Sequence, residues 1–352
     1  MSRHRWDPVC APPRGLVHPV PVDPRGLAGP TRGRARGPGW RQSSHGLYVP
    51  SYVDPTVPEQ RILEQAARLP RDGAVTGWAA CRLHGASFFD GLAIDGATRL
   101  PVPLVLGARG QLAPGPACTV SRERLLGTEV VTRLGVRCTA ARRALFDERR
   151  RVGDVREAVV AMDMMAAAEL VSVAQMRAYV AQRPAWAGVG QVRRALPLAS
   201  EHSRSPNETR LRLLWVLDAG LPTPLVNQEV YDQDGRLLGI ADLLDPVAGV
   251  VGEYDGAEHR SALRHSRDVA REDAFRRVGL EYFTVVGPDL RSPGRVLDRI
   301  LATRLRARWL PEDRRAWTTR PPAWRTPTSP LDAMNLDERL AYRAWLAENP
   351  TG

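Results

Sequence analysis

The chain has 352 residues, of which 43% are hydrophobic and 25% are charged, and its formal net charge is +11. This is ordinary globular composition with room for two cores, so it excludes a fibrous or wholly disordered chain. No signal peptide or membrane span is evident, and the cysteines form no CxxC spacing, so we expect a cytoplasmic protein without a zinc knuckle or disulfide framework.

The positive charge is concentrated near the two ends of the chain. Residues 1–45 hold eight Arg and two Asp, and residues 291–326 hold ten Arg and three acids. Because arginine pairs bidentately with phosphate, basic arms on a neutral body favour nucleic acid, most simply DNA, as the partner. Solvated tails are the plainer explanation, and both interpretations stay open.

The first 45 residues contain eight Pro and six Gly, so we expect a basic arm that is disordered. After them, HGLYVPS predicts a short strand, and VPEQRILEQAARLP and AVTGWAACRLHG predict helices. Residues 100–136 alternate short apolar runs with Gly and Pro, as small strands do, and helical patterns follow. We therefore predict a small mixed α+β domain over 46–195 with a mostly helical second half.

A linker at 196–204 leads to a second domain, predicted over 205–300. Its pattern indicates a helix at 206–219, three strands joined by tight turns, a helix around 262–278 and the strand EYFTVVG. The element order is αβββαβ, and the whole chain belongs to the α/β (α+β) class. In the tail, 301–352, Trp and Arg alternate, which suits either stacking on single strands or docking on the domain itself. The tryptophans are Trp309, Trp317 and Trp324.

Three acids lie among apolar residues in the stretch GIADLLDPVAGVVGEYDG. The turn centres near Val247 and Ala248, so Asp242 should lie opposite Glu253, about 5 Å away at Cβ. Asp255 lies two residues further on and shares the face of Glu253. Like charges so placed repel unless a proton or cation compensates them. Mg²⁺ or Mn²⁺ suits such a site, although an ordinary strand running into a turn would explain the same sequence.

Two further features have both a structural and a functional interpretation. Ser205, Pro206 and Glu208 form a capping box, yet an acid on the first turn of a helix can also face the sheet. The helix around 262–278 carries a basic stripe, which is either a solvated face laced with ion pairs or a phosphate-binding surface. The stripe consists of Arg264, Arg267 and Arg271.

The second domain resembles the PD-(D/E)XK nuclease superfamily. The resemblance covers about 200–290 and rests on the αβββαβ order, Glu208, Asp242, the stretch EYDGAEH and the RDVARED helix. The closest branch is the Vsr-like family, related to very-short-patch-repair endonucleases, with the pattern E-x-D-G-x-x-H. The matching residues are Glu253, Asp255, Gly256 and His259.

This resemblance implies a restriction-endonuclease-like core and a Mg²⁺-dependent DNA endonuclease. Asp242 and Glu253 would hold the metal, with Glu208 or Asp255 assisting. His259 would be the general acid or base, because its unperturbed pKa suits that task, and the basic stripe would bind phosphates. Asp255 stands at the Lys position of the superfamily, as is usual in this branch.

The upstream region, 46–195, resembles that of many actinobacterial proteins similar to AbiEi-type antitoxins of type IV toxin–antitoxin systems. The matching stretches are HGLYVPS, AVTGWAACRLHG and GVRCTAARRALFDE. This implies DNA binding and a toxin partner, although 1–45 shows no readable pair of helices for the winged helix of that family. The alternative functions are therefore a non-catalytic, antitoxin-like transcriptional regulator with a nuclease-fold scaffold, and a protein-interaction module that never contacts nucleic acid.

Overall fold

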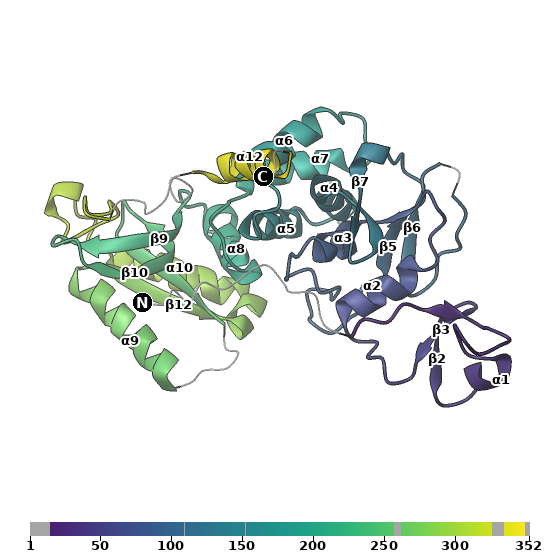
Figure 1. Cartoon of the computed structure of the whole chain (residues 1–352). Coiled ribbons are helices and arrows are strands. Elements are labelled where there is room, and N and C mark those ends of the chain that lie inside the picture. The colour runs from purple at the N-terminus through teal and green to yellow at the C-terminus, as the bar shows by residue number, and fades with distance from the viewer. Residues whose placement is uncertain (1–14, 109, 152, 257–261, 326–333, 349–352) are drawn as a thin grey trace. The chain divides into compact units, whose positions relative to one another are not determined.

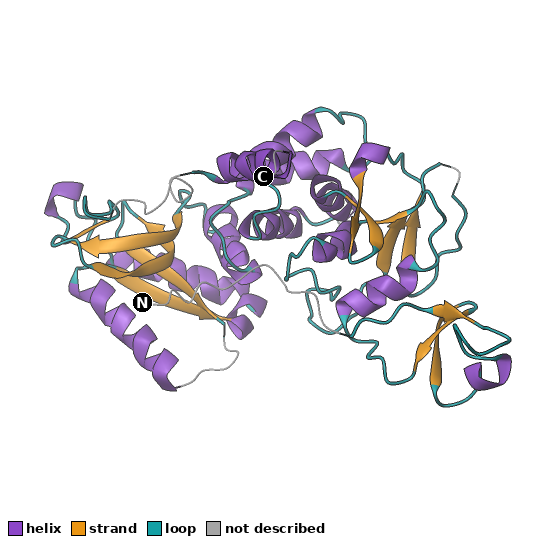
Figure 2. Cartoon of the chain, viewed as in Figure 1, coloured by secondary structure: helices purple, strands orange, loops and turns teal. Residues whose placement is uncertain are grey.

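A computed structural model describes residues 15–108, 110–151, 153–256, 262–325 and 334–348. The chain divides into two compact units, Met1–Ala158 with Ala168–Arg194, and Val159–Ala167 with Ala195–Gly352. Both units combine helices and strands, which confirms the predicted α+β class (Figure 2). Within the described ranges, no helix has the length and apolar character needed to cross a membrane.

The described part of the basic arm, 15–45, is ordered, so the prediction of disorder was wrong there. β1 (Val20–Pro21), β2 (Trp40–Ser44) and β3 (Leu47–Pro50) form a three-stranded sheet in the order β1–β3–β2, and α1 (Arg32–Ala35) precedes β2. Gly46, at a φ of 73°, makes the tight turn between β2 and β3. Gln60 exchanges two hydrogen bonds with the backbone of Val17, which anchors the arm.

The main sheet of the first unit has five strands in the order β6–β5–β4–β8–β7 (Figure 1). The strands are β4 (Ala74–Val75), β5 (Val102–Val105), β6 (Cys118–Ser121), β7 (Val130–Arg133) and β8 (Val136–Thr139). The helices are α2 (Pro58–Ala66), α3 (Gly77–Leu83), α4 (Ala141–Arg151), α5 (Val155–Ala167), α6 (Val173–Ala181) and α7 (Val189–Ala195), with 3-10 turns at Gly127–Glu129 and Leu196–Leu198. The predicted strands at 100–136 and the mostly helical second half are both observed. The last nine residues of α5 belong to the second unit.

The second unit follows the predicted αβββαβ order. Its first six elements are α8 (Pro206–Leu213, continued by a π turn at Leu214–Asp218), β9 (Leu225–Asp232), β10 (Leu237–Asp245), β11 (Val250–Asp255), α9 (Ala262–Arg277) and β12 (Glu281–Val286). A 3-10 turn (Gly287–Arg291), α10 (Pro293–Arg306), a second 3-10 turn (Glu312–Arg314), β13 (Trp317–Thr318) and α12 (Leu336–Glu348) follow. The sheet order is β12–β11–β10–β9–β13, and β11 and β12 are parallel because α9 connects them as a crossover.

Helices cover both faces of this sheet (Figure 1). On the face of α8 and α10, the core includes Leu211, Trp215 and Phe283. On the face of α9, it includes Phe275 and Tyr282. A strand buried on both faces offers few places for ionised groups, so the acids of β10 and β11 need an explanation.

The predicted boundary at 300 was wrong, because the segment beyond it completes the second unit. α10 continues to Arg306, and β13 pairs with β9 through Trp317 and Asp232. Trp317 is buried in the core on the α9 side, so this part of the tail docks on its own domain. Trp309 and Trp324 remain 45% and 74% exposed, so only for these two does stacking on another molecule stay a prediction.

Candidate active site

The register of β10 and β11 agrees with the prediction made from the turn. Leu243 pairs with Gly252 and Leu244 pairs with Val251, so the next position outward sets Asp242 against Glu253. The two carboxyl groups interact electrostatically. Their proximity follows from the position of one tight turn.

Glu253 is buried with only half of its carboxylate satisfied. Its Oε2 accepts a hydrogen bond from Arg271 Nη2 and another, of 2.9 Å, from the hydroxyl of Tyr282. Its Oε1 is buried and has no hydrogen-bond partner among the residues that the structure describes. Burial raises the pKa of Glu253 above its ordinary value, although Arg271 and Tyr282 act in the opposite direction.

Asp242 is partly buried, and its Oδ2 accepts a 2.8 Å hydrogen bond from the backbone N–H of Tyr254. Burial is the largest cause that holds the pKa of Asp242 well above its ordinary range, and the charges of Glu208 and Glu253 add to it. The N–H of Tyr254 and the charge of Arg271 oppose this shift without cancelling it. Counted over the described side chains, the site therefore has more negative charge than its own groups compensate.

Glu208 forms only one half of the predicted capping box, and its side chain also faces the sheet. At the start of α8, the Ser205 hydroxyl accepts the Glu208 N–H at 3.2 Å, as a capping residue does. The Glu208 carboxylate accepts from the N–H of Arg204, at 2.9 Å, rather than from that of Ser205. The same oxygen accepts from Asn227 Nδ2 on β9 at 2.8 Å, so the side chain also faces the sheet. Glu208, Asp242 and Glu253 are called the acidic cluster below.

Sequence reasoning missed two residues of this site, Asn227 and Tyr282. Asn227 lies opposite Asp242 in the β9–β10 register and has a left-handed φ of 49°. Asparagine is one of the few residues with a side chain that tolerates this conformation, so an Asn inside a predicted strand was a usable signal. Tyr282 carried no such signal, because a buried aromatic residue in a strand needs no other explanation.

Arg271 is the residue of the basic stripe whose contacts the structure describes. Besides Glu253, its Nη2 lies 3.2 Å from Asp268. The stem of the side chain crosses β10 at Gly239, where a Cβ would lie 2.8 Å from both Cγ and Cδ of Arg271. Glycine is required at this crossing. The expected role of Arg271 in phosphate binding stays a prediction, because its guanidinium here pairs with the carboxylates of Glu253 and Asp268.

The remaining predicted residues are less closely defined. Asp255 pairs with Val286 in the parallel β11–β12 register and shares the face of Glu253 by alternation. His259 lies outside the described residues, and so do the side chains of Arg264 and Arg267 on α9. Across the described ranges, no three His, Cys, Asp or Glu side chains gather as a ready metal site. The expected convergence of Asp242, Glu253 and Asp255 as one ligand set is therefore not observed.

Two carboxylates nevertheless suffice to test whether the site suits a divalent cation. Mg²⁺ is commonly held by one or two carboxylates, with waters and substrate phosphates completing its shell. The unpartnered Oε1 of Glu253 and the raised pKa of Asp242 both indicate a position where added positive charge would be favourable. Asp242 and Glu253 therefore fit a bound Mg²⁺ or Mn²⁺.

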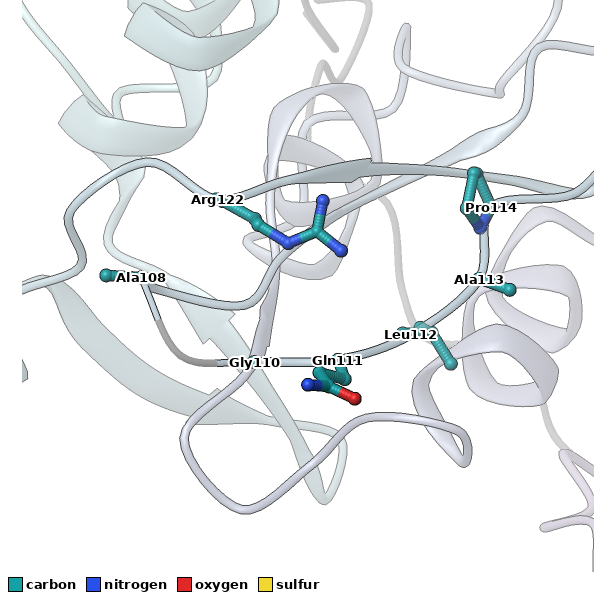
Figure 3. Close-up of a pocket in the computed structure, with 7 residues that line it drawn as sticks. All are labelled: Ala108, Gly110, Gln111, Leu112, Ala113, Pro114 and Arg122. Carbon is teal, nitrogen blue, oxygen red and sulfur yellow. The ribbon is translucent and has the colours of Figure 1, made fainter.

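A separate hollow lies in the first unit, in the loop between β5 and β6 (Figure 3). Among its described lining residues, Arg122 is the charged one, and Gln111 adds an amide. The other lining residues are Ala108, Gly110, Leu112, Ala113 and Pro114. Because this set offers no acid, base or nucleophile, the hollow does not compete with the acidic cluster as a catalytic site.

No family model, curated protein or solved structure matches the chain. The resemblances to PD-(D/E)XK nucleases and to AbiEi-type antitoxins therefore stay predictions. The functional interpretation rests on the geometry of the acidic cluster.

Proposed function

We propose that the second unit is a Mg²⁺- or Mn²⁺-dependent endonuclease that hydrolyses phosphodiester bonds in DNA. The observation that carries the proposal is Glu253 Oε1, a carboxylate oxygen that is buried beside a second acid and has no donor among the described side chains and backbone. Leaving such an atom without a partner costs about 1–3 kcal/mol, and more when the group is charged. Unfavourable local arrangements of this kind cluster at active sites and ligand-binding sites.

Asp242 and Glu253 would hold the cation, which when bound would polarise a phosphate and lower the pKa of a water. The chain's own contribution is positioning. The backbone N–H of Tyr254 fixes Asp242 Oδ2, and Asn227 ties Glu208 to β9 near the start of α8. Glu208 adds negative charge that favours a cation at Asp242. Each acid is thus placed by a different element of the core.

Basic residues support a polyanionic substrate. Of the arginines in 291–326, Arg299 and Arg304 are paired with Asp289 and Asp245 inside the unit. Others remain exposed, so basic surface accompanies the unit that holds the acidic cluster, as phosphate binding requires. The exposed residues include Arg291, Arg295 and Arg308.

Cleavage of labelled oligonucleotides tests the proposal. Duplex, mismatched and single-stranded DNA would be incubated with the full chain in Mg²⁺ or Mn²⁺, with and without EDTA. We expect cleavage that EDTA abolishes and that Asp242→Asn reduces by about a hundredfold or more, since each metal ligand supplies several kcal/mol. The matched control is Glu312→Gln, which removes an exposed acid paired with exposed Arg320. Undiminished cleavage in EDTA or in Asp242→Asn would reject the proposal.

One observation favours a second candidate, the non-catalytic regulator. The ion pair between Arg271 and Glu253 already compensates part of the buried charge without a metal. A scaffold of this kind would bind DNA equally well in EDTA, with an affinity that falls steeply as salt rises. Metal-independent binding without cleavage of any substrate would favour this candidate.

A further inference from the structure

Two glutamates on the sheet of the second unit have the same kinds of partner. Each accepts hydrogen bonds from a tyrosine of the sheet and from an arginine that reaches it from outside the sheet. At Glu229 on β9, the Tyr231 hydroxyl donates to Oε2 at 2.6 Å and Arg325 Nη2 donates to Oε1 at 2.8 Å. Arg325 also donates to the Tyr231 hydroxyl. Both oxygens of Glu229 therefore have donors.

At Glu253 the same chemistry is distributed differently. Tyr282 and Arg271 both donate to Oε2, and within the described part of the chain Oε1 has no partner. The Glu253 side chain is 6% exposed, whereas that of Glu229 is 29% exposed. The more deeply buried carboxylate is thus the less satisfied one, which is the reverse of what stability alone favours.

We propose that Tyr282 and Arg271 are positioning residues that clamp Oε2 of Glu253 and leave Oε1 as the atom offered to a divalent cation. This inference rests on the function proposed above. Carboxylates that bind metals are themselves held by hydrogen bonds, and loss of such a partner typically costs about 10–100-fold in metal affinity. This role belongs to the hydroxyl of Tyr282, because packing in the core needs only its ring.

Each half of the clamp is fixed by packing. Tyr282 is 6% exposed and stacks on Phe275 with ring centroids 6.2 Å apart, so its hydroxyl has a defined position. The Arg271 stem lies against Gly239, which leaves it room to reach Glu253 across β10. A binding group held in this way needs little reorganisation when its ligand arrives.

The test is Mn²⁺ binding to the full chain, followed by the electron paramagnetic resonance signal of free Mn²⁺. Tyr282→Phe keeps the packed ring and the net charge and removes only the hydroxyl. We expect its Kd for Mn²⁺ to be about tenfold higher than that of the wild type, with an unchanged metal-free melting temperature. Tyr231→Phe is the matched control, since it removes a hydroxyl from a glutamate of the same sheet. Its Kd should equal the wild-type value.

A second variant tests the other half. Arg271→Lys keeps the positive charge but shortens the side chain and loses the guanidinium fork, so Oε2 should lose that donor. We expect Mn²⁺ binding to weaken severalfold, on the order of the effect of Tyr282→Phe. Arg276→Lys is its control, because Arg276 on the same helix pairs with Glu272, and both of these side chains are more exposed.

The possible results separate this inference from the proposed function. Wild-type affinity in Tyr282→Phe overturns the clamp, and so does a lowered melting temperature without a change in Kd. If the wild type binds Mn²⁺ and Asp242→Asn does not, the metal site stands whatever the clamp variants show. If the wild type binds no Mn²⁺, both the metal site and the clamp are rejected.

Discussion

Each unit of the protein buries a cluster of charged side chains, and the two clusters are balanced in opposite ways. The cluster of the first unit combines two acids with two arginines and a tyrosine. Its members are Glu129, Asp147, Arg143, Arg183 and Tyr179, called the Arg143 cluster here. The acidic cluster of the second unit contains three acids, and Arg271 is the arginine that the described residues place against it.

The difference is visible in the pKa values of the carboxyl groups. Burial alone would raise the pKa of Glu129, but Tyr179, Arg143 and Arg183 outweigh it and hold that pKa below its ordinary value. Both Glu129 oxygens accept hydrogen bonds, at distances of 2.5 to 2.9 Å. The pKa of Asp242 is shifted far upward instead. Buried charge that is paired is explained by structure alone, whereas an unbalanced excess of one sign is the arrangement that the proposed cation site would need.

The largest expected effect comes from removing the cation of the balanced cluster. Arg143 is fully buried and pairs with Glu129 and Asp147, so Arg143→Met leaves Asp147 without its ion pair and Glu129 with Arg183 alone. We expect the first unit to lose about 3–5 kcal/mol of unfolding free energy. Pulse-labelling hydrogen exchange with mass spectrometry, across a urea series, reports each unit of the full chain separately. A loss below about 1 kcal/mol would mean that the cluster is not a structural unit.

A smaller effect is expected from Glu129→Gln. The amide keeps the shape of the side chain but loses the charge that Arg143 and Arg183 share. We expect a loss of about 2 kcal/mol in the first unit, by the same measurement. No change in stability would show that the arginines do not depend on this acid.

In the acidic cluster, the corresponding substitution should raise the stability of its unit instead of lowering it. Asp242→Asn removes a carboxyl group whose ionisation is opposed by burial and by two other acids. We expect the second unit to gain stability at pH 7, within the range of about 0.5–2 kcal/mol that single stabilising substitutions commonly give. A loss of stability would mean that Asp242 is a structural residue, and the contrast between the clusters would fail.

The free energy of unfolding should also depend on pH differently in the two units. Each group contributes a slope of less than about 1.4 kcal/mol per pH unit. The raised pKa of Asp242 means that the folded chain keeps a proton that the unfolded chain releases near 3.8. The stability of the second unit should therefore fall as pH rises from about 4 towards the folded pKa of Asp242. The lowered pKa of Glu129 stabilises the first unit above its ordinary value of 4.5, and this contribution is lost as pH falls through the folded pKa. Urea midpoints measured for both units between pH 3 and 8 check this, and Asp242→Asn should flatten the slope of the second unit alone.

Local patterns in the sequence were enough to predict the frame of the site. The turn after β10 is short, and Gly249 at a φ of 78° closes it, so counting outward placed Asp242 opposite Glu253 correctly. The αβββαβ order followed from periodicity and turn residues for the same reason. Both depend on residues that are near one another along the chain.

The partners of the acids could not be predicted, because they depend on contacts between distant elements. The Tyr282 hydroxyl reaches Glu253 only because α9 brings β12 back parallel to β11. Arg271 reaches it only because Gly239, 32 positions earlier in the sequence, leaves space on β10. The composition of 15–45 suggested disorder, and it was overridden by the contacts of that segment with Gln60 of α2.

The two-residue strand β13 has a consequence for how the protein behaves in concentrated solution. The outer side of β9 would otherwise present unpaired N–H and C=O groups along its length, and such an edge is a template on which another chain can pair. β13 covers one end of this edge, and Trp317 fixes it in the core. A fragment that stopped at residue 300 would expose both the edge and the apolar site of Trp317. We expect such a fragment to self-associate more readily than the full chain, because the tail covers its own sheet edge.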